Sequence, residues 1–519
     1  MEACNQEGSL KGALLFIGAI TLALCTFMQT LDSSIANVSI PDIAGDLAAS
    51  VSEGTWVITL FAVGNAIALP LTGFFSRRFG AIRIMCLSVG LFSLFSLLCG
   101  LSFSLPMLVV MRFFQGFVAG PLIPLSQSLM VMTFPKEKKN LALAIWNMVA
   151  ILGPVIGPIL GGWITFNFSW PWIFLINIPI GIFCMMMIKV LYKSREVPPQ
   201  KVRVDGVGIF LLAVTVTTLQ IILDQGQLLD WWDSNLIRLL AGVSFLSLCL
   251  FITWERFEQE PIVDLKLFKN RNFLIGTFLT ALSYMVIFGT IVVTPLWLQE
   301  FMGYNAKVAG LAISSVGIVP FFSVLFVSRL MSKISLRLLV MLSFVCYATV
   351  LFFCSTFTSE VSFKVISFSR FFFGVGMAIW LAPLTALTFA RISPEKLPMG
   401  TGVFHFFRIF MGGIGASLFV TLWERRQSFH HANLASNLNE YNPLSQSFFH
   451  TLKDIGIEGE KAFAYSNTVI GKQAALLSLN EIFWLGGWSC IICLLIALFF
   501  KRRKKDKRGL LKGEEGSKA

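Results

Sequence analysis

The first residue of this sequence that could do chemistry is an aspartate in an apolar setting. Asp32 stands near the far end of an apolar run that begins at about Ala13. A carboxylate inside a membrane is costly unless it is paired, neutralised or hydrated, so its presence points to a function such as proton binding. Gln29 and Asn37 stand close to it on the same run and are candidate substrate or coupling residues.

A basic residue stands at a similar depth in another apolar run. Arg112 lies about one and a half turns into the run 105–132, which we expect to cross the membrane in the opposite direction to the first run. A neighbouring guanidinium favours the charged form of a carboxylate, whereas loss of solvent favours the neutral form. We therefore predict that Asp32 and Arg112 couple proton binding to a conformational change. The alternative is a static ion pair that only positions helices.

Other polar side chains enter or border the apolar runs. Five of them are further candidate substrate or coupling residues: Asp224, Glu300, His405, Arg408 and Glu481. Arg408 lies deepest, with His405 one turn before it, and an arginine at that depth requires a partner or a water-filled cavity. For Asp224, Glu300 and Glu481 the alternative is a position in water at the membrane surface.

Glycines and prolines indicate contacts between helices. Gly153, Gly157 and Gly161 share one helix face, where a second helix can approach closely. Pro154 and Pro158 are expected to bend that helix because they lack a backbone N–H. The glycine stripe suits static packing and also a sliding surface for alternating access. Three further candidates for gating lie at the end of the second run and in the connection to the third: Gly73, Arg78 and Gly80.

Several kinds of chemistry are disfavoured. The sequence has no Walker A motif for ATP, no H-E-x-x-H zinc motif and no G-x-S-x-G nucleophile motif. The chain is therefore predicted to be a transporter driven by an ion gradient rather than an enzyme. His430, His431 and His450 stand in the polar segment 424–480 without a cysteine or a tight set of carboxylates. We expect no metal site there, but a solvated loop.

Composition places the chain in a membrane. Of its 519 residues 56% are hydrophobic and only 13% are charged, about half the charged fraction of a soluble domain. The net charge of +13 does not indicate a nucleic-acid partner, because the basic residues fall in every second gap between apolar runs, as topology signals do.

Fourteen apolar runs are long enough to be membrane helices. Their predicted limits are 13–36, 54–75, 82–102, 105–132, 141–165, 171–191, 205–224, 236–254, 273–298, 307–328, 336–357, 363–390, 399–423 and 481–500. Basic residues occupy the even-numbered gaps. Both ends, 1–12 and the basic tail 501–519, are therefore expected in the cytoplasm, and the segment 424–480 outside.

A short repeat divides the chain. The residues from Arg112 to Gly116 recur, with one change, from Arg370 to Gly374, eight helices later and in a helix of the same direction. Two parallel six-helix halves, 13–191 and 273–500, with an inserted pair of helices at 205–254 would give this spacing. Parallel repeats are a transporter architecture. The predicted fold is thus an all-α integral membrane protein with fourteen transmembrane helices.

Several stretches resemble the fourteen-helix drug:proton antiporters of the major facilitator superfamily. The matching stretches are Leu31 to Pro41, Leu108 to Gly120, Gly153 to Gly162 and Trp172 to Gly181. Three more resemble the EmrB-type multidrug exporters of that family: Leu219 to Gly226, Pro261 to Lys269 and Asn480 to Trp484. One departure is Arg77, which replaces the acid that the superfamily usually has between its second and third helices.

The resemblance implies export of hydrophobic toxic compounds across a bacterial inner membrane by alternating access. Energy would come from the proton gradient, without a cofactor. A periplasmic adaptor and an outer-membrane channel are implied as partners, beside protons, substrates and membrane lipid. Two different functions stay open. The same fold could export one endogenous metabolite, such as a siderophore or a lipid, or the chain could be a membrane scaffold or sensor that has lost transport.

Overall fold

The structure is a computed structural model that describes residues 12–135, 138–193, 199, 205–226, 229–259, 261–439 and 441–500. All regular elements within these residues are helices. Thirteen of them are long and apolar enough to cross a membrane, and a bent pair of helices supplies a fourteenth span. The predicted class, an all-α membrane protein with fourteen spans, is confirmed. The predicted segment 1–12, apart from its last residue, and the tail 501–519 lie outside the described residues.

The N-terminal half contains six spans, of which two are interrupted. They are α1 (Gly12–Val38), α4 (Trp56–Phe79), α5 (Ala81–Gly100), α6 (Leu105–Ala119) followed by α7 (Leu122–Thr133), α8 (Lys139–Asn167), and α9 (Trp172–Leu175) followed by α10 (Asn177–Tyr192). The predicted fourth run breaks between α6 and α7 at Gly120 and Pro121, because proline cannot donate the backbone hydrogen bond that continues a helix. Short helices α2 (Ile40–Asp46) and α3 (Val51–Gly54) join α1 to α4.

The part of the chain from Arg271 to Ala497 contains six further spans. Its spans are α13 (Arg271–Glu300), then α14 (Ala306–Ser314), α15 (Ile318–Phe322) and α16 (Val324–Lys333), α17 (Leu336–Cys354), α18 (Phe363–Ala378) with α19 (Leu381–Thr388), α20 (Leu397–Ser436) and α22 (Glu460–Ala497). The single helix predicted at 307–328 is wrong in detail, since this span is broken and bends by 55°. Gly317 and Pro320 lie in the broken part, and such residues weaken the helical hydrogen-bond ladder.

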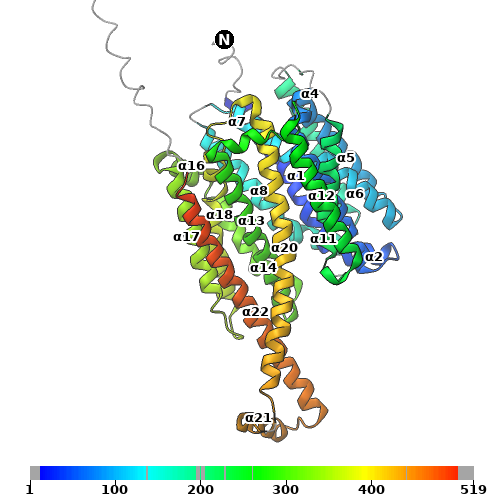
Figure 1. Cartoon of the computed structure of the whole chain (residues 1–519), viewed down its shortest axis with the longest axis vertical. Helices are drawn as coiled ribbons and strands as arrows, with labels where there is room; N and C mark the ends of the chain where they lie inside the picture. Colours follow the sequence, from blue (N-terminus) through cyan, green and yellow to red (C-terminus); the bar gives the residue numbers. More distant parts are fainter. Residues whose placement is uncertain are drawn as a thin grey trace, which may run out of the picture.

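The inserted pair, α11 (Gly206–Gln225) and α12 (Asn235–Phe257), packs as a hairpin beside the seam between the two halves (Figure 1). α11 contacts α4 of the first half and α20 of the second. The chain then enters the second half through a short turn. There Asp264 accepts a hydrogen bond from the Lys266 backbone and pairs with Lys396 at 2.8 Å. Burial raises the pKa of Asp264, but the hydrogen bonds from Lys396 and the Lys266 backbone, together with the charges of both lysines, lower it below its ordinary value.

The two halves meet at the end of the bundle where α20 begins. The Thr401 hydroxyl of α20 donates to the Pro124 carbonyl of α7 at 3.2 Å. A Cβ added to Gly73 would overlap Met399, so this candidate gating glycine allows α4 and α20 to touch. Gly80, in the turn between α4 and α5, has a φ of +96°, a conformation that side-chain-bearing residues rarely adopt. The passage between the halves is therefore closed at this end.

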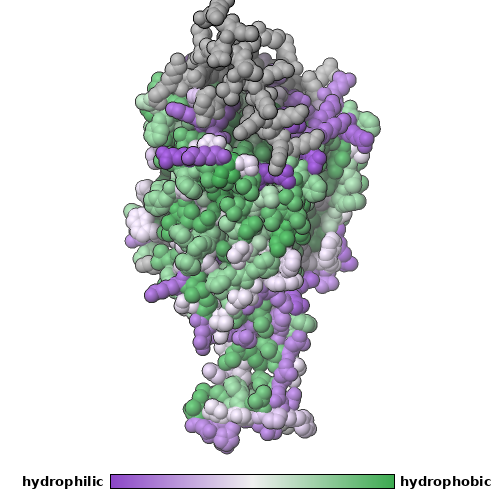
Figure 2. Space-filling view, turned by 90° about the vertical axis from the view of Figure 1, so that its left-hand side faces the viewer, coloured by the Kyte–Doolittle hydropathy of each residue, from purple (hydrophilic) through white to green (hydrophobic). Residues whose placement is uncertain are grey.

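The other end of the molecule carries a projecting stalk, residues 424–480. The expectation of a solvated loop there was wrong. α20 continues to Ser436, α22 begins already at Glu460, and α21 (Pro443–Asp454) lies between them at the tip (Figure 1). The predicted limits of α20 and α22 followed hydropathy and therefore stopped at the membrane surface. Polar residues with a high helix propensity extend both helices beyond that surface. The space-filling view shows a green, apolar body and more purple, polar surface along the stalk (Figure 2).

The glycine stripe of α8 lies against α1. A Cβ added to Gly153 would overlap the side chain of Thr30, and one added to Gly157 would overlap that of Ser34. A second helix therefore lies close to the glycine stripe in this structure. α8 continues through Pro154 and Pro158 as one helix, so the expected bend does not interrupt it.

This packing yields a first prediction. Gly157→Ala would place a methyl group against Ser34, and overpacking of this kind costs about 1–3 kcal/mol. Gly162→Ala is the matched control on the same helix, because its Cβ would lie 3.6 Å from Val38, an ordinary contact. We expect Gly157→Ala to lower the melting temperature of the purified protein and Gly162→Ala to leave it unchanged or raised. Equal melting temperatures of the two variants would contradict the contact.

Candidate functional site

The structure brings Asp32 and Arg112 together. Asp32 lies on α1 and Arg112 on α6, and Nη1 of Arg112 donates to Oδ2 of Asp32 at 2.6 Å. Both side chains are completely buried. An ion pair without solvent needs further hydrogen bonds to offset the loss of hydration, so the surroundings of the two charges decide what the pair can do.

Uncharged side chains from three helices complete the environment of the carboxylate. Nδ2 of Asn177 (α10) and Nε2 of Gln115 (α6) donate to Oδ1 of Asp32 at 2.8 and 3.2 Å. Both amide nitrogens also lie 3.1 Å from the hydroxyl of Ser96 (α5), which itself donates to the Phe174 carbonyl at 2.8 Å. The carboxylate thus accepts three hydrogen bonds in a site that excludes water.

Arg112 is also held independently of the aspartate. Its Nε donates to the Val57 carbonyl at 3.2 Å, and its Nη1 also contacts Oε1 of Gln115 at 2.8 Å. The guanidinium lies over the rings of Phe61 and Phe174, with 4.1 and 5.3 Å to the ring centroids. Aromatic faces stabilise a desolvated cation. The arginine can therefore remain in place, still charged, if Asp32 becomes neutral.

The second half has the same arginine without the acid. Arg370 on α18 is buried, and its Nη2 donates to the hydroxyl of Thr294 on α13 at 2.9 Å. Its guanidinium lies 5.4 Å from the centroid of the Phe483 ring of α22. In the same way, the guanidinium of Arg112 faces the ring of Phe174, at the start of the sixth span. The repeat therefore extends to the packing around each arginine. Among the residues that the structure describes, only the first copy has a carboxylate paired with the arginine.

His405 and Arg408 of α20 lie where the two halves adjoin. Nε2 of His405 is 2.8 Å from Oε1 of Gln127 on α7, so this hydrogen bond crosses from one half to the other. Arg408 is buried, faces the ring of Tyr284 at 5.0 Å, and borders a cavity of about 40 Å³ between α8, α13, α19 and α20. Arg408 thus lies beside a cavity in this structure.

The remaining candidates lie apart from Asp32 or take other contacts. Gln29 is buried on α1, whereas Asn37 and Glu300 are exposed. Asp224 accepts hydrogen bonds from Nε2 of Gln220 at 3.1 Å to both oxygens. Glu481 forms a two-pronged ion pair with Arg426 at the base of the stalk, at 2.5 and 2.7 Å. Arg78 lies 5.7 Å from the ring of Phe79. None of these contacts reaches the Asp32 site.

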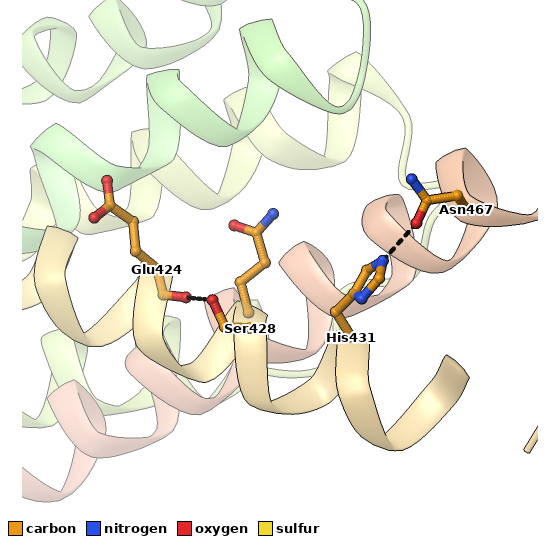
Figure 3. A pocket seen from close by; sticks show the side chains of 5 residues that line it. Glu424, Ser428, His431 and Asn467 are labelled. Carbon is orange, nitrogen blue, oxygen red and sulfur yellow. Dashed lines mark hydrogen bonds between the residues drawn. The ribbon is translucent and has the colours of Figure 1, made fainter. Parts of the chain in front are cut away.

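An open depression of about 520 Å³ lies on the stalk (Figure 3). It is lined by Glu424, Gln427, Ser428, His431 and Asn467. Nε2 of His431 lies 2.8 Å from Oδ1 of Asn467, and this contact joins α20 to α22. Among the described residues no three metal-binding side chains come together. His430 and His431 contact Glu481 and Asn467 of α22, and His450 contacts Asp454 within α21.

Ser96 and Asn177 were not among the predicted site residues, although they complete the hydrogen bonds around Asp32. A signal existed for Asn177, which lies within one of the stretches that resemble the family's motifs. Ser96 is one of several serines in apolar runs, and serine in a membrane helix commonly bonds its own backbone. Its role follows only from the tertiary structure.

The buried pair yields a second prediction. Arg112→Ala leaves a carboxylate unpaired in a dry site, which costs about 3–5 kcal/mol, and adding Asp32→Asn removes that charge. We therefore expect the double variant to have a higher melting temperature than Arg112→Ala alone. The control is the same double-mutant cycle at the half-exposed stalk pair, with Arg426→Ala and Glu481→Gln. The interaction free energy between these two residues should be less than about 1 kcal/mol. A double variant as unstable as Arg112→Ala would contradict the predicted coupling.

The site and fold can be compared with known proteins. Residues 22–416 match the model of the Major Facilitator Superfamily. The chain is 42% identical to multidrug export protein EmrB of Escherichia coli (strain K12) over 498 residues, which covers 96% of this chain and 97% of that protein. It is 41% identical to fatty acid resistance protein FarB of Neisseria gonorrhoeae over 492 residues, with coverage of 95% and 97%.

Solved structures agree in fold. A double-tryptophan mutant of the sugar transporter XylE aligns with a TM-score of 0.62 at 13% identity, covering 95% of this chain and 97% of that one. This identity is too low to carry function, but the fold of two helical halves is shared. Together with the family match over most of the chain and the relatives of nearly equal length, these findings show that the chain belongs to the major facilitator superfamily.

Proposed function

We propose that this protein is a proton-coupled exporter of small hydrophobic compounds, and that Asp32 and Arg112 couple proton movement to transport. The observation that carries the proposal is the fully buried Asp32–Arg112 pair, completed by hydrogen bonds from Gln115 and Asn177. A pair that served stability alone would be expensive, since well-packed apolar residues often do as well. The names of relatives such as EmrB support drug export.

The coupling works through the charge of one carboxylate. With Asp32 ionised, Arg112 binds it and α1 is drawn to α6. When a proton binds Asp32, the attraction is lost, but Arg112 keeps its contacts to Gln115 and Val57. α1 is then less tightly held, and because α8 lies along α1 through the glycine stripe, a shift of α1 reaches the seam between the halves. Protonation thereby biases the equilibrium between two access states.

Location and partners form part of the proposal. The alternation of basic residues and the resemblance support a bacterial inner membrane, both termini in the cytoplasm and the stalk in the periplasm. In this orientation the seam is closed on the cytoplasmic side, where Thr401 bonds Pro124. The stalk would then be the part of the exporter that meets a periplasmic adaptor, which in turn joins an outer-membrane channel.

A narrower substrate is the second candidate function. One relative is named a fatty acid resistance protein, which favours export of a lipid-like compound over export of a siderophore. A role as a membrane scaffold or sensor gains no support, because such a protein has no need for a buried acid–base pair.

A third prediction tests proton coupling. Asp32→Asn keeps the side chain's shape and removes the titratable charge, so drug-dependent proton movement should be abolished. The substrate is a hydrophobic antibiotic, selected by growth inhibition in a host without its own pumps. The full chain is placed in proteoliposomes that contain a pH-sensitive dye, and a gradient of this antibiotic is imposed across their membrane. Asp454→Asn is the control, because this stalk carboxylate is 64% exposed.

We expect the control to move protons at the wild-type rate. Wild-type proton movement by Asp32→Asn would instead make Asp32 structural, and the coupling acid would have to be sought among Asp224, Glu300 and Glu481.

A further inference from the structure

Two buried acids stand together at the base of the inserted hairpin. Asp205 is 7% exposed and directly precedes α11, whereas Glu255 is 3% exposed and lies near the end of α12. Neither of them belongs to the hydrogen-bonded site around Asp32 or lines the cavity at the seam. Acidic side chains are almost never fully buried unless they are paired, so these two require an explanation of their own.

One oxygen of each acid is satisfied by hydrogen bonds. Oδ1 of Asp205 accepts from the backbone N–H of Gly208 and from Nε1 of Trp254, both at 2.8 Å. Oε2 of Glu255 accepts from the backbone N–H of Val263 at 3.3 Å. These bonds join the start of α11, the end of α12 and the chain that follows α12.

The second oxygen of each acid has no donor. Oδ2 of Asp205 and Oε1 of Glu255 are buried and have no hydrogen-bond partner among the described residues. The two oxygens surround one point, because a Cβ added to Gly208 would overlap the first and lie 3.1 Å from the second. Ionised carboxylates only accept hydrogen bonds, so neither acid can satisfy the other while both are charged.

Basic side chains do not compensate for this pair in the described part of the chain. The groups that act electrostatically on Glu255 are Asp205 and Glu258, and both are acidic. Arg256 follows Glu255 directly, but its side chain is exposed. Two negative charges would therefore be held close together without a counter-ion, which is unfavourable in a site with little water.

The charged groups of the surrounding elements are engaged with other partners or form no ion pair with the two acids. α4, the start of α20 and the chain after α12 carry such groups at this end of the bundle: Arg77, Arg78, Asp264, Lys266, Lys269 and Lys396. Lys266 and Lys396 act on Asp264. Among the ion pairs of the described residues, none includes Asp205 or Glu255.

From this arrangement we propose that Asp205 and Glu255 share one proton, held between their two unpartnered oxygens. One side chain then donates as a carboxylic acid and the other accepts as a carboxylate. Both oxygens gain a partner, and a single negative charge remains buried, as in other pairs of adjacent carboxyl groups. A proton fits this site better than a metal ion, because no third metal-binding side chain of the described residues joins the two acids.

The shared proton affects the seam between the halves through the linker, residues 261–270. The backbone of Val263 donates to Glu255, and the next residue, Asp264, pairs with Lys396 just before α20. Loss of the proton would leave two adjacent carboxylates, whose repulsion separates the ends of α11 and α12 and weakens the contact to Val263. The proton thus holds the linker against the end of the bundle where the halves are closed.

Trypsin cleavage measures whether the proton holds the linker. The full chain in nanodiscs is digested at neutral and at alkaline pH. Cleavage after Lys266 or Lys269 of the linker is divided by cleavage after Lys453 of the stalk, which cancels the pH dependence of trypsin itself. Because alkaline pH removes the shared proton, we expect this ratio to rise several-fold in wild type. Asp205→Asn and Glu255→Gln should keep it constant, since an amide N–H permanently takes the place of the proton.

The matched control is Asp264→Asn, which removes a carboxylate of the same linker that pairs with a lysine and not with an acid. Its ratio should start above that of wild type and still rise with pH. Melting temperatures provide a second measurement. Asparagine is a good N-cap residue, so Asp205→Asn preserves the start of α11. We expect both amide variants to melt like wild type at neutral pH and at a higher temperature than wild type at alkaline pH.

A wild-type cleavage ratio that does not change with pH would overturn the inference, and so would a rise that persists unchanged in either amide variant. If magnesium chloride raises the melting temperature of wild type but not that of the amide variants, a metal ion takes the place of the proton and the inference is equally wrong. The measurements involve no transport and can be repeated in Asp32→Asn. Their outcome is therefore independent of whether Asp32 couples protons to export.

Discussion

The ion pair between Asp32 and Arg112 is the interaction on which the first half of this protein depends. Two opposite charges in a dry site repay their desolvation only with good geometry and further hydrogen bonds. The chain provides both, through a 2.6 Å contact and through amide and hydroxyl groups from α5, α6 and α10. The orientation of four helices is thereby tied to the charge of one carboxylate. A proton that binds there changes the free energy of the whole arrangement.

The two halves have similar helix packing around an arginine of the fourth span, but they differ in the polar groups beside it. Both hold an arginine of the fourth span between the first, third and sixth spans, and in both a glycine one turn later touches the second span, Gly116 at Phe61 and Gly374 at Val316. Within the described part of the chain, a carboxylate pairs with this arginine only in the first half. The second half instead presents Arg408 toward a cavity at the seam. The Asp32–Arg112 pair and the cavity beside Arg408 are thus separate in space, and α8 adjoins both because it lies on α1 and lines the cavity.

Residues of a type that is rare in its surroundings could be identified from the sequence alone. A charge in an apolar run is conspicuous, so Asp32, Arg112 and Arg408 were identifiable, and hydrophobic length fixed the number of spans. It could not find what depends on the tertiary structure. Ser96 and Asn177 have no sequence feature that predicts their place in the hydrogen bonds around Asp32, because only the tertiary structure brings them there. The stalk was predicted as a loop because hydropathy reports where a helix leaves the membrane and not where it ends. The break near Pro320 could not be predicted from the sequence, because it depends on how both flanking helices pack.

The protonation state of Asp32 can be observed directly by infrared difference spectroscopy of the full chain in membranes. A protonated carboxylic acid in a dry site has its own C=O stretching band, separate from that of ionised carboxylates. We predict that lowering the pH, or adding substrate at constant pH, changes the intensity of such a band. The change should be absent from Asp32→Asn and present in Asp224→Asn. An identical band change in wild type and Asp32→Asn would contradict the central claim that Asp32 carries the coupled proton.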